Sequence, residues 1–249
     1  MKVMIHAHTT YSADGELSPH QLALIACKRG FDAVLVSDHF ESLREETFAD
    51  LVAACGNISE CLMVPGYERS FRGYHILALG IDRWFDDGNI LSWCDNVRSA
   101  GGITAVAHPV RYNHVIPTDI VEAVDAIEVW NSKFVYDGEL GPNPRSYRLL
   151  GKHRYPLCSQ DLHGLRHASP VGVRFANNCA NAAEIISCLQ RGEYRMTNGI
   201  VSYGSDLSKA SDQVLRAFHM TRRQAVKSAI RLRRWMRTPA GCRARGEHD

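Results

Sequence analysis

The sequence predicts an α/β fold in which a parallel sheet closes into a (β/α) barrel, and two observations support this prediction. Short segments rich in Val, Ile and Leu alternate with amphipathic segments from residue 2 to about residue 190. Such alternation is typical of parallel sheets. The chain has 249 residues, 45% hydrophobic and 22% charged, and α/β barrels of about this length fold as one domain. This composition excludes a disordered or fibrous protein.

Eight segments are predicted to be strands, namely 2–6, 33–37, 62–66, 75–81, 103–107, 126–130, 155–159 and 171–175. The strand 75–81 follows its predecessor after only a short link, 69–74, so we expect a hairpin there instead of a crossover helix. Two helices have clear start signals. Ser18 is followed by Pro19 and Gln21, and Asn181 is followed three residues later by Glu184. Both patterns indicate a capped first turn.

The charge is unevenly distributed along the chain. The net charge is +2, yet ten of the 29 Lys and Arg residues and only two of the 27 acidic residues lie in 216–249. This segment therefore carries +8 and the remainder −6. We predict a body, residues 1–205, followed by a basic helical extension, residues 206–249, whose helix runs to about Met236. The extension could bind nucleic acid, with Trp235 stacking on a base, lie on an anionic membrane surface, dock on the acidic body, or simply be a solvated face.

The eight cysteines are scattered and contain no CxxC pair. This pattern argues against a zinc ribbon, a thioredoxin-like motif and a secreted disulfide scaffold, so we expect reduced and mostly buried thiols. The first apolar run is too short for a signal peptide, and no window of about 18 residues is apolar enough for a membrane span. These features predict a cytoplasmic protein.

Histidines and carboxylates concentrate where the predicted strands end. The positions are His6, His8, Asp14, Asp38, His39, Glu68, His75, His108, Asp161 and His163. Barrel active sites are built at the carboxyl ends of the strands, so we expect these side chains to converge. Nitrogen and oxygen donors without thiolates suit Zn²⁺, Mn²⁺ or Fe²⁺, and the number of donors exceeds one tetrahedral shell. The sequence therefore predicts two to three divalent ions that share a bridging carboxylate.

Some of these residues have a plainer explanation. Asp14 precedes Gly15, and Asp-Gly is a common turn. Asp38 could orient His39 instead of binding a metal directly. The other histidines, such as His20 and His114, are expected to be structural.

Six ordered motifs resemble those of the PHP superfamily of phosphoesterases, named for polymerase and histidinol phosphatase. They are His6-Ala7-His8-Thr9 with Tyr11-Ser12-Ala13-Asp14-Gly15, then Ser37-Asp38-His39, Gly66-Tyr67-Glu68, His75-Ile76-Leu77, Ala107-His108-Pro109 and Asp161-Leu162-His163. The resemblance covers residues 2 to about 175. It implies a distorted (β/α)7 TIM-like barrel with a trinuclear metal site that hydrolyses phosphate esters.

The resemblance also implies a distribution of ligands. The first metal would take His6, His8, Glu68 and Asp161, the second would take Glu68 as bridge with His75 and His108, and the third would take Asp14, His39 and His163. The segments 75–82 and 107–112 look most like the branch of nucleoside-phosphate phosphatases and oligonucleotide exonucleases. Two features depart from the family pattern: only about fifty residues separate His108 from Asp161, and Gln160 stands where a serine is usual.

The expected reaction is hydrolysis of a phosphate monoester, or of a nucleotide or oligonucleotide phosphoester, by a hydroxide that bridges two metals. Coordination lowers the pKa of water to about 7, which supplies hydroxide at neutral pH. Glu68, His39 and His163 are the predicted catalytic residues. Arg111 is the first candidate for binding the substrate phosphate, and Arg145 and Arg72 are the next candidates.

Three alternative functions remain open. A histidinol-phosphatase-like enzyme acts on small molecules with the same reaction centre, whereas amidohydrolases cleave C–N or C–O bonds at similar barrel sites. The amidohydrolase reading fits less well, because those enzymes usually use a bridging lysine and we expect no lysine at a strand end. A non-catalytic or regulatory protein that binds nucleic acid through its basic extension is the third reading.

Overall fold

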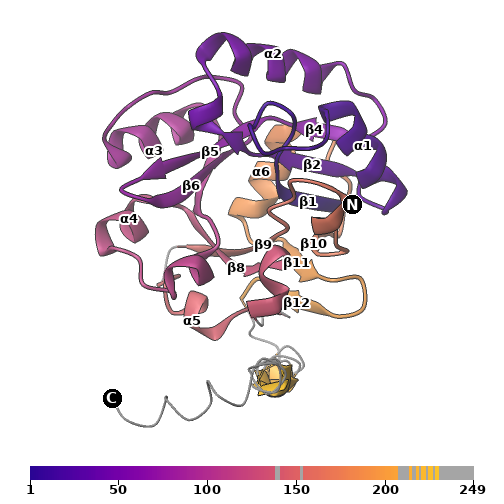
Figure 1. Ribbon diagram of the computed structural model, residues 1–249, viewed down its shortest axis with the longest axis vertical. Helices are drawn as coiled ribbons and strands as arrows, with labels where there is room; N and C mark the ends of the chain where they lie inside the picture. The colour runs from indigo at the N-terminus through magenta and orange to yellow at the C-terminus, as the bar shows by residue number, and fades with distance from the viewer. Residues whose placement is uncertain are drawn as a thin grey trace, which may run out of the picture.

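The computed structural model describes residues 1–137, 141–151 and 154–206, together with separate positions between 213 and 229. Its strands form two six-stranded sheets, with the orders β12-β11-β10-β1-β2-β4 and β3-β5-β6-β7-β8-β9. Helices lie around the outside of these sheets, with α1 and α2 beside β2 and β4, and α3 and α4 beside β5 and β6 (Figure 1). The mixed α/β class predicted from the sequence is confirmed.

The first sheet is built on β1, whose neighbours run in opposite directions. β1 (Lys2–Ala7) pairs in parallel with β2 (Ala33–Val36), and β2 pairs in parallel with β4 (Leu62–Val64). On its other side β1 pairs antiparallel with β10 (Gly172–Phe175). Two further antiparallel strands, β11 (Tyr194–Thr197) and β12 (Ser202–Gly204), extend the sheet and were not predicted from the sequence.

The second sheet contains the predicted hairpin. β5 (Gly66–Phe71) pairs antiparallel with β6 (Tyr74–Leu79), so the hairpin expected at this point is confirmed. β6 pairs antiparallel with β7 (Ile103–Val106), which is followed by the parallel strands β8 (Ala126–Asn131) and β9 (Tyr155–Ser159). At the other edge, the two-residue strand β3 (Asp38–His39) pairs in parallel with β5.

The described strands do not form the single closed sheet of the predicted (β/α)7 TIM-like barrel. Pairing breaks at Ser37, where the chain leaves β2 in one sheet and enters β3 in the other. On the opposite side, β1 touches the segment after β9 through one isolated parallel bridge, Ala7 to Leu162. The antiparallel strands further depart from a regular βαβ repeat. The two sheets nevertheless bring the ends of β1, β3, β5 and β9 to one region.

The helices begin where the sequence signals predict. Ser18 caps α1 (Pro19–Lys28): its hydroxyl accepts a hydrogen bond from the Gln21 backbone, and the Gln21 side chain accepts one from the Ser18 backbone. Asn181 caps α6 (Ala182–Gln190) by accepting from the Glu184 backbone. The remaining helices are α2 (Glu45–Gly56), α3 (Ile90–Ser99), α4 (Thr118–Ala123) and α5 (Pro144–Tyr147). Short 3-10 turns are η1 (Phe40–Ser42), η2 (Pro109–Tyr112), η3 (Ser132–Asp137) and η4 (Leu165–His167).

The strands are buried on both faces. Every residue of β2, β7 and β8 is buried, and the largest fully buried side chains include Trp93, Trp130 and Tyr67. A strand buried on both faces reads as a continuous apolar run, which is why these segments could be recognised in the sequence. Polar residues within such runs are therefore exceptional, and they mark the site described below.

The described residues include seven of the eight cysteines and part of the extension. Seven cysteines are free, and Cys55, Cys61, Cys94 and Cys158 are buried, as expected for reduced thiols. Cys242 lies outside the described residues, as does the extension beyond residue 229. The described positions between 213 and 229 are helical, with Val214 and Phe218 exposed. No helix among the described residues is long and apolar enough to cross a membrane.

The capping box of α1 gives a stability prediction. Ser18→Ala should lower the free energy of unfolding by about 0.5–2 kcal/mol, because the Gln21 backbone N–H loses its acceptor at the helix start. Urea unfolding followed by circular dichroism measures this change. Ser70→Ala, at an exposed position near the end of β5, is the control and should change stability by less. An equal effect of the two substitutions would show that the cap contributes nothing specific.

Candidate metal centre

The predicted histidines and carboxylates converge on one cavity of about 210 Å³. Its lining residues are all charged or imidazole side chains: Asp14, His39, Glu68, His75, His108, Arg111, Lys133, Asp161 and His163. His6 and His8 lie against the same group and are fully buried. The structure thus brings together all nine residues predicted as metal ligands.

β1 delivers two histidines through a bulge. The pairing of β1 with β2 shifts between Ile5 and Ala7, which leaves His6 as an extra residue with a φ of 65°. His6 Nε2 and His8 Nε2 are 3.1 Å apart. The sequence argument placed both side chains on one face because of regular strand geometry, but the bulge is what aims His6 at the site.

Glu68 lies at the centre of the cluster and is 1% exposed. Its Oε1 is 2.9 Å from His75 Nδ1 and 3.0 Å from His108 Nε2. Its Oε2 is 3.2 Å from His39 Nδ1 and 3.5 Å from the Nε2 atoms of both His6 and His8. One carboxylate therefore faces five imidazoles from β1, the loop after it, β3, β6 and the end of β7.

The donor atoms around Glu68 fit a cation. Glu68 Oε2 is buried and has no hydrogen-bond partner in the described part of the chain. Several triads place ligand-type atoms within 4.8 Å of one another, namely His6-His8-Glu68, His6-His108-Asp161, His8-His39-His163 and His39-Glu68-His75. A buried carboxylate oxygen that faces ring nitrogens without a hydrogen bond is a position that a metal ion would satisfy.

Asp161 reaches the cluster because its loop pairs with β1. The Leu162 backbone donates to the His6 carbonyl at 3.1 Å, and the His8 backbone donates to the Leu162 carbonyl at 2.7 Å. Asp161 has a φ of 49°, and its Oδ1 lies 3.4 Å from His8 Nε2. The Gln160 side chain donates to the carbonyls of Ser169 and Val171, which holds the loop on the other side.

Asp14, His39 and His163 form a further group of contacts, of which Asp14 is the most exposed member. Asp14 Oδ1 is 3.4 Å from His39 Nε2, and its Oδ2 is 3.2 Å from His163 Nε2. The Asp14 side chain is 59% exposed, whereas that of His163 is 6% exposed. Asp14 therefore lies at the mouth of the cavity and contacts the two histidines with which the resemblance groups it.

Asp38 supports the site without touching the cavity. It accepts hydrogen bonds from the Thr9 backbone, the Thr9 hydroxyl and the Ser12 hydroxyl at 2.6–2.7 Å. Ser12 in turn accepts from the His39 backbone at 2.8 Å. Burial raises the pKa of Asp38, and these hydrogen bonds oppose that rise. Asp38 thus orders the loop after β1 and, through Ser12, holds the backbone of His39.

Glu128 is a residue of the site that the sequence analysis missed. It is 1% exposed in β8, where its Oε1 lies 2.7 Å from His6 Nδ1 and its Oε2 accepts from the His108 backbone at 2.6 Å. The Asn131 amide donates to the same Oε2 at 3.0 Å. A bond at Nδ1 leaves the Nε2 of His6 free to act as a ligand. The sequence feature that could have identified Glu128 is that it is a single acidic residue inside an otherwise apolar strand.

Lys133 was also missed, and its position contradicts the expectation that no lysine lies at a strand end. It follows β8 by two residues and lines the cavity. Its Nζ is 3.0 Å from Asp161 Oδ2 and 3.3 Å from His163 Nδ1. The argument that located the other residues, position just after a strand, applies equally to Lys133.

The arginines predicted to bind phosphate have different positions. Arg111, in η2, lines the cavity. Arg145, in α5, donates to the Asn113 carbonyl at 2.5 Å and does not line the cavity. Arg72 forms an ion pair of 2.6 Å with Asp119. Arg111 is therefore the predicted arginine that remains available at the site.

The electrostatics of the cluster are strongly perturbed. Burial alone would lower the pKa of His6, but Glu128, Glu68 and Asp161 raise it well above the usual value. Burial would raise the pKa values of Glu68 and Asp161, yet the imidazoles hold both well below their usual range. Burial lowers the pKa of His8 to about 3. Ionised carboxylates and a neutral His8 suit metal binding, whereas at His6 a metal ion would have to displace the proton that the surrounding carboxylates favour.

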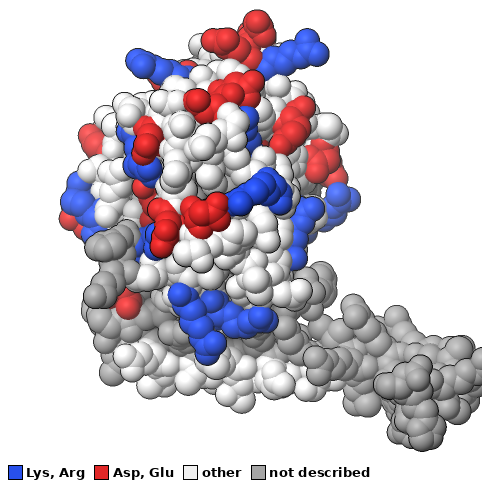
Figure 2. Space-filling model, turned by 90° about the vertical axis from the view of Figure 1, so that its left-hand side faces the viewer, with Lys and Arg blue, Asp and Glu red and all other residues white. Residues whose placement is uncertain are grey.

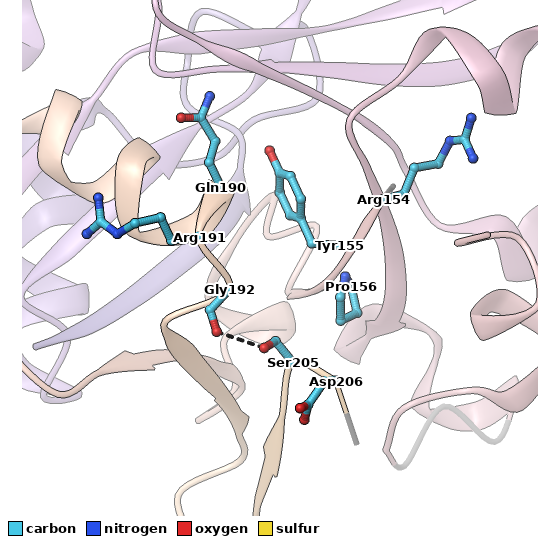
Figure 3. Close-up of a pocket in the computed structure, with 8 residues that line it drawn as sticks. All are labelled: Arg154, Tyr155, Pro156, Gln190, Arg191, Gly192, Ser205 and Asp206. Carbon is cyan, nitrogen blue, oxygen red and sulfur yellow. Dashed lines mark hydrogen bonds between the residues drawn. The ribbon is translucent and has the colours of Figure 1, made fainter. Parts of the chain in front are cut away.

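A second cavity, of about 410 Å³, is larger but lacks this convergence (Figure 3). It lies near the start of β9, the end of α6 and the end of β12. The side chains of Arg154 and Arg191 point away from each other in Figure 3, and the hydroxyl of Ser205 donates to the Gly192 carbonyl at 2.7 Å. Arg191 is bound to Glu193. Size alone therefore does not identify the functional site, and the chemistry favours the smaller cavity.

Solved structures show which fold this is. A two-domain protein from Bacteroides vulgatus ATCC 8482, described as containing a predicted PHP-like metal-dependent phosphoesterase, is 16% identical with a TM-score of 0.64. The match covers 83% of this chain and 67% of that protein. PsfC from Pseudomonas syringae PB-5123 is 14% identical with a TM-score of 0.58, over 90% of this chain and 98% of PsfC. No protein-family model and no curated protein match the sequence. The resemblance to PHP-like phosphoesterases is thus confirmed at the level of the fold.

Glu128 provides a test of the centre that leaves its ligands intact. Glu128→Gln should weaken metal binding by about 10- to 100-fold, because His6 and the His108 backbone lose their anionic partner. Competition with a chromogenic chelator measures the affinity. Glu122→Gln, which changes an exposed carboxylate on α4, is the matched control. Wild-type metal affinity in Glu128→Gln would show that the buried carboxylate does not support the centre.

Proposed function

We propose that the chain is a metal-dependent phosphoesterase that hydrolyses a phosphate monoester or a nucleotide or oligonucleotide phosphoester. The main observation is the buried Glu68 carboxylate surrounded by five imidazoles in a cavity lined only by charged and imidazole side chains. The PHP-like fold supports the same reaction class, since PHP-like phosphoesterase is the description of a protein with this fold. Fold alone does not decide function, so the proposal depends mainly on the site.

The donor set suits two to three divalent ions, Zn²⁺, Mn²⁺ or Fe²⁺. When bound, such ions supply hydroxide at neutral pH and neutralise charge on the phosphoryl oxygens. In the proposed trinuclear arrangement His6, His8, Glu68 and Asp161 hold the first ion. Glu68, His75 and His108 hold the second, and Asp14, His39 and His163 hold the third. The contacts of Asp14 with both His39 and His163 support the third set.

The chain's own residues have distinct tasks in this proposal. Glu68 keeps its charge in the interior and joins the ligand sets. His39 and His163 lie toward the open side of the cavity, next to the exposed Asp14, where a leaving group would depart. Arg111 lies on the same cavity wall and can bind a nonbridging oxygen. The closest branch of substrates, as the sequence motifs suggest, is nucleoside phosphates and short oligonucleotides.

Removing Glu68 tests the proposal directly. Glu68→Ala should lose bound metal and hydrolysis together, because the carboxylate at the centre of the ligand set is gone. Elemental analysis of untagged protein, with phosphate release from AMP, adenosine 3′,5′-bisphosphate, histidinol phosphate and a short oligonucleotide, measures both properties. The wild type should hold two to three equivalents of metal and release phosphate from at least one of these compounds. Full metal content and activity in Glu68→Ala would exclude the proposed centre.

The sequence analysis disfavoured an amidohydrolase because it expected no lysine at a strand end, but Lys133 lies at such a position. However, its ammonium pairs with Asp161 at 3.0 Å, and Glu68 already occupies the middle of the cluster. A bridging lysine would have to take that central position. Phosphoester hydrolysis therefore remains the better supported function.

The basic extension, residues 206–249, is proposed to be a separate unit that contributes nothing to catalysis. Figure 2 shows acidic and basic side chains interspersed over most of one face of the body, with a smaller basic group toward its lower edge. That face therefore offers no broad cationic surface for nucleic acid. The cytoplasmic location stays a prediction.

Deleting residues 216–249 should leave hydrolysis of a small chromogenic phosphate unchanged, because all the proposed ligands lie before residue 164. Steady-state kinetics of the shortened and full chains, with circular dichroism to confirm folding, provide the measurement. If the shortened chain does not fold, the extension is part of the body and the boundary at 205 is wrong.

A further inference from the structure

Lys133 is a cation inside the candidate metal centre that no predicted ligand set uses. Its Nζ lies 3.0 Å from Asp161 Oδ2, and its side chain is 30% exposed on the wall of the cavity. The backbone of Lys133 donates to the Asn131 side chain at 3.0 Å, which fixes the turn after β8. Asn131 also donates to Glu128. The position of Lys133 is therefore built into the same support that orients His6 and His108.

The ammonium has donors to spare. A lysine carries three N–H donors and no acceptor. His163 Nδ1 lies 3.0 Å from the Asp161 carbonyl, which can only accept, so this ring nitrogen carries its proton and cannot accept from Lys133. Within the described part of the chain, Asp161 Oδ2 is thus the acceptor that Lys133 retains. Two of its three N–H groups are thus left for a ligand in the cavity that Lys133 lines.

The two oxygens of the Asp161 carboxylate face different groups. Its Oδ1 faces the ligand side, 3.4 Å from His8 Nε2 and 3.6 Å from His6 Nε2. Its Oδ2 faces Lys133. The lysine is thereby anchored beside the metal ligands without competing for the oxygen that points at them.

The cavity limits what can approach these donors. Its volume of about 210 Å³ is below the roughly 300–1,000 Å³ of pockets that enclose whole drug-sized ligands. Its lining residues are all charged or imidazole side chains, with no aliphatic, phenyl, phenol or indole group among them. A compact anionic group can enter, whereas a bulky apolar substituent has no complementary surface there. Arg111 supplies a second cation on the same lining.

We infer that Lys133 is a substrate-binding residue which, together with Arg111, binds nonbridging oxygens of a terminal phosphoryl group and makes the site selective for dianionic phosphate monoesters over diesters. This inference depends on the proposed phosphoesterase function. A terminal phosphoryl group presents three nonbridging oxygens and a double charge, which two fixed cations beside the metal ligands can use. A diester has one charge and a second substituent that the small polar cavity does not accommodate.

The test uses the full chain loaded with Mn²⁺ and two variants, Lys133→Met and Lys133→Arg. Isothermal titration with inorganic phosphate should show at least about tenfold weaker binding for Lys133→Met, the effect of losing one charge-assisted hydrogen bond. Metal content should stay at the wild-type level. Lys133→Arg should recover part of the phosphate affinity. Lys28→Met, at an exposed position in the last turn of α1, is the matched control.

Kinetics separate substrate binding from a structural role. For Lys133→Met, the KM for p-nitrophenyl phosphate should rise at least about tenfold while hydrolysis of bis(p-nitrophenyl) phosphate changes much less. The monoester-to-diester preference should therefore fall by a similar factor. Unchanged phosphate affinity, or loss of metal from Lys133→Met, would overturn the inference, the second by showing that the lysine only positions Asp161. A wild type that binds metal and phosphate but hydrolyses neither ester would refute the proposed function, and the phosphate titration would still decide the role of Lys133.

Discussion

The burial of the Glu68 carboxylate is the constraint that shapes the rest of the molecule. A charge that is 1% exposed is costly unless the protein surrounds it with compensating groups. Five imidazoles supply that compensation, and they come from segments that are distant in the sequence. The ends of β1, β3 and β7, the start of β6 and the first half of β5 therefore meet at one place, which the two-residue strand β3 and the hairpin of β5 and β6 make possible. The position of the site and the departure from a regular barrel have the same cause.

The backbone is strained where the site is assembled. His6, His108 and Asp161 have φ values of 65°, 31° and 49°, in a region that residues with a side chain rarely adopt. Each such conformation costs on the order of 1–3 kcal/mol, so the surrounding structure must enforce it. It does so through hydrogen bonds: the His108 backbone donates to Glu128, and the Leu162 backbone donates to the His6 carbonyl. The cost of these conformations fits a site whose side chains are positioned for ligand binding.

Much of this architecture could be predicted because it depends on local patterns. The strands are apolar runs buried on both faces, and the caps at Ser18 and Asn181 are local hydrogen-bond motifs. The convergence of the histidines followed from their place after the strands. The break between β2 and β3 could not be predicted, because a single residue, Ser37, separates two strands that belong to different sheets. β11 and β12 were also missed: they follow α6 as two short antiparallel strands, each of only three or four residues, beyond the last apolar run recognised in the sequence.

The two missed site residues show where pattern recognition fails. Glu128 lies within a strand and Lys133 lies two residues beyond its end, so neither matched the expected motifs of histidine and carboxylate. Their importance becomes visible only in three dimensions, where Glu128 contacts His6 and the His108 backbone and Lys133 contacts Asp161. Residues that orient metal ligands are identified by the groups they contact in the folded protein, and their spacing along the sequence does not reveal them.

The charge balance of the centre connects these residues to the chemistry. Four carboxylates line the cavity or contact its imidazoles directly, namely Asp14, Glu68, Glu128 and Asp161. Two divalent ions would carry an equal positive charge, and histidine ligands are neutral. Lys133, which contacts Asp161, and Arg111 then add two positive charges to this balanced set, so a dianion neutralises the loaded site better than a monoanion does. This attraction is screened beyond a Debye length of about 10 Å, so it acts mainly on a group that has entered the cavity of about 210 Å³.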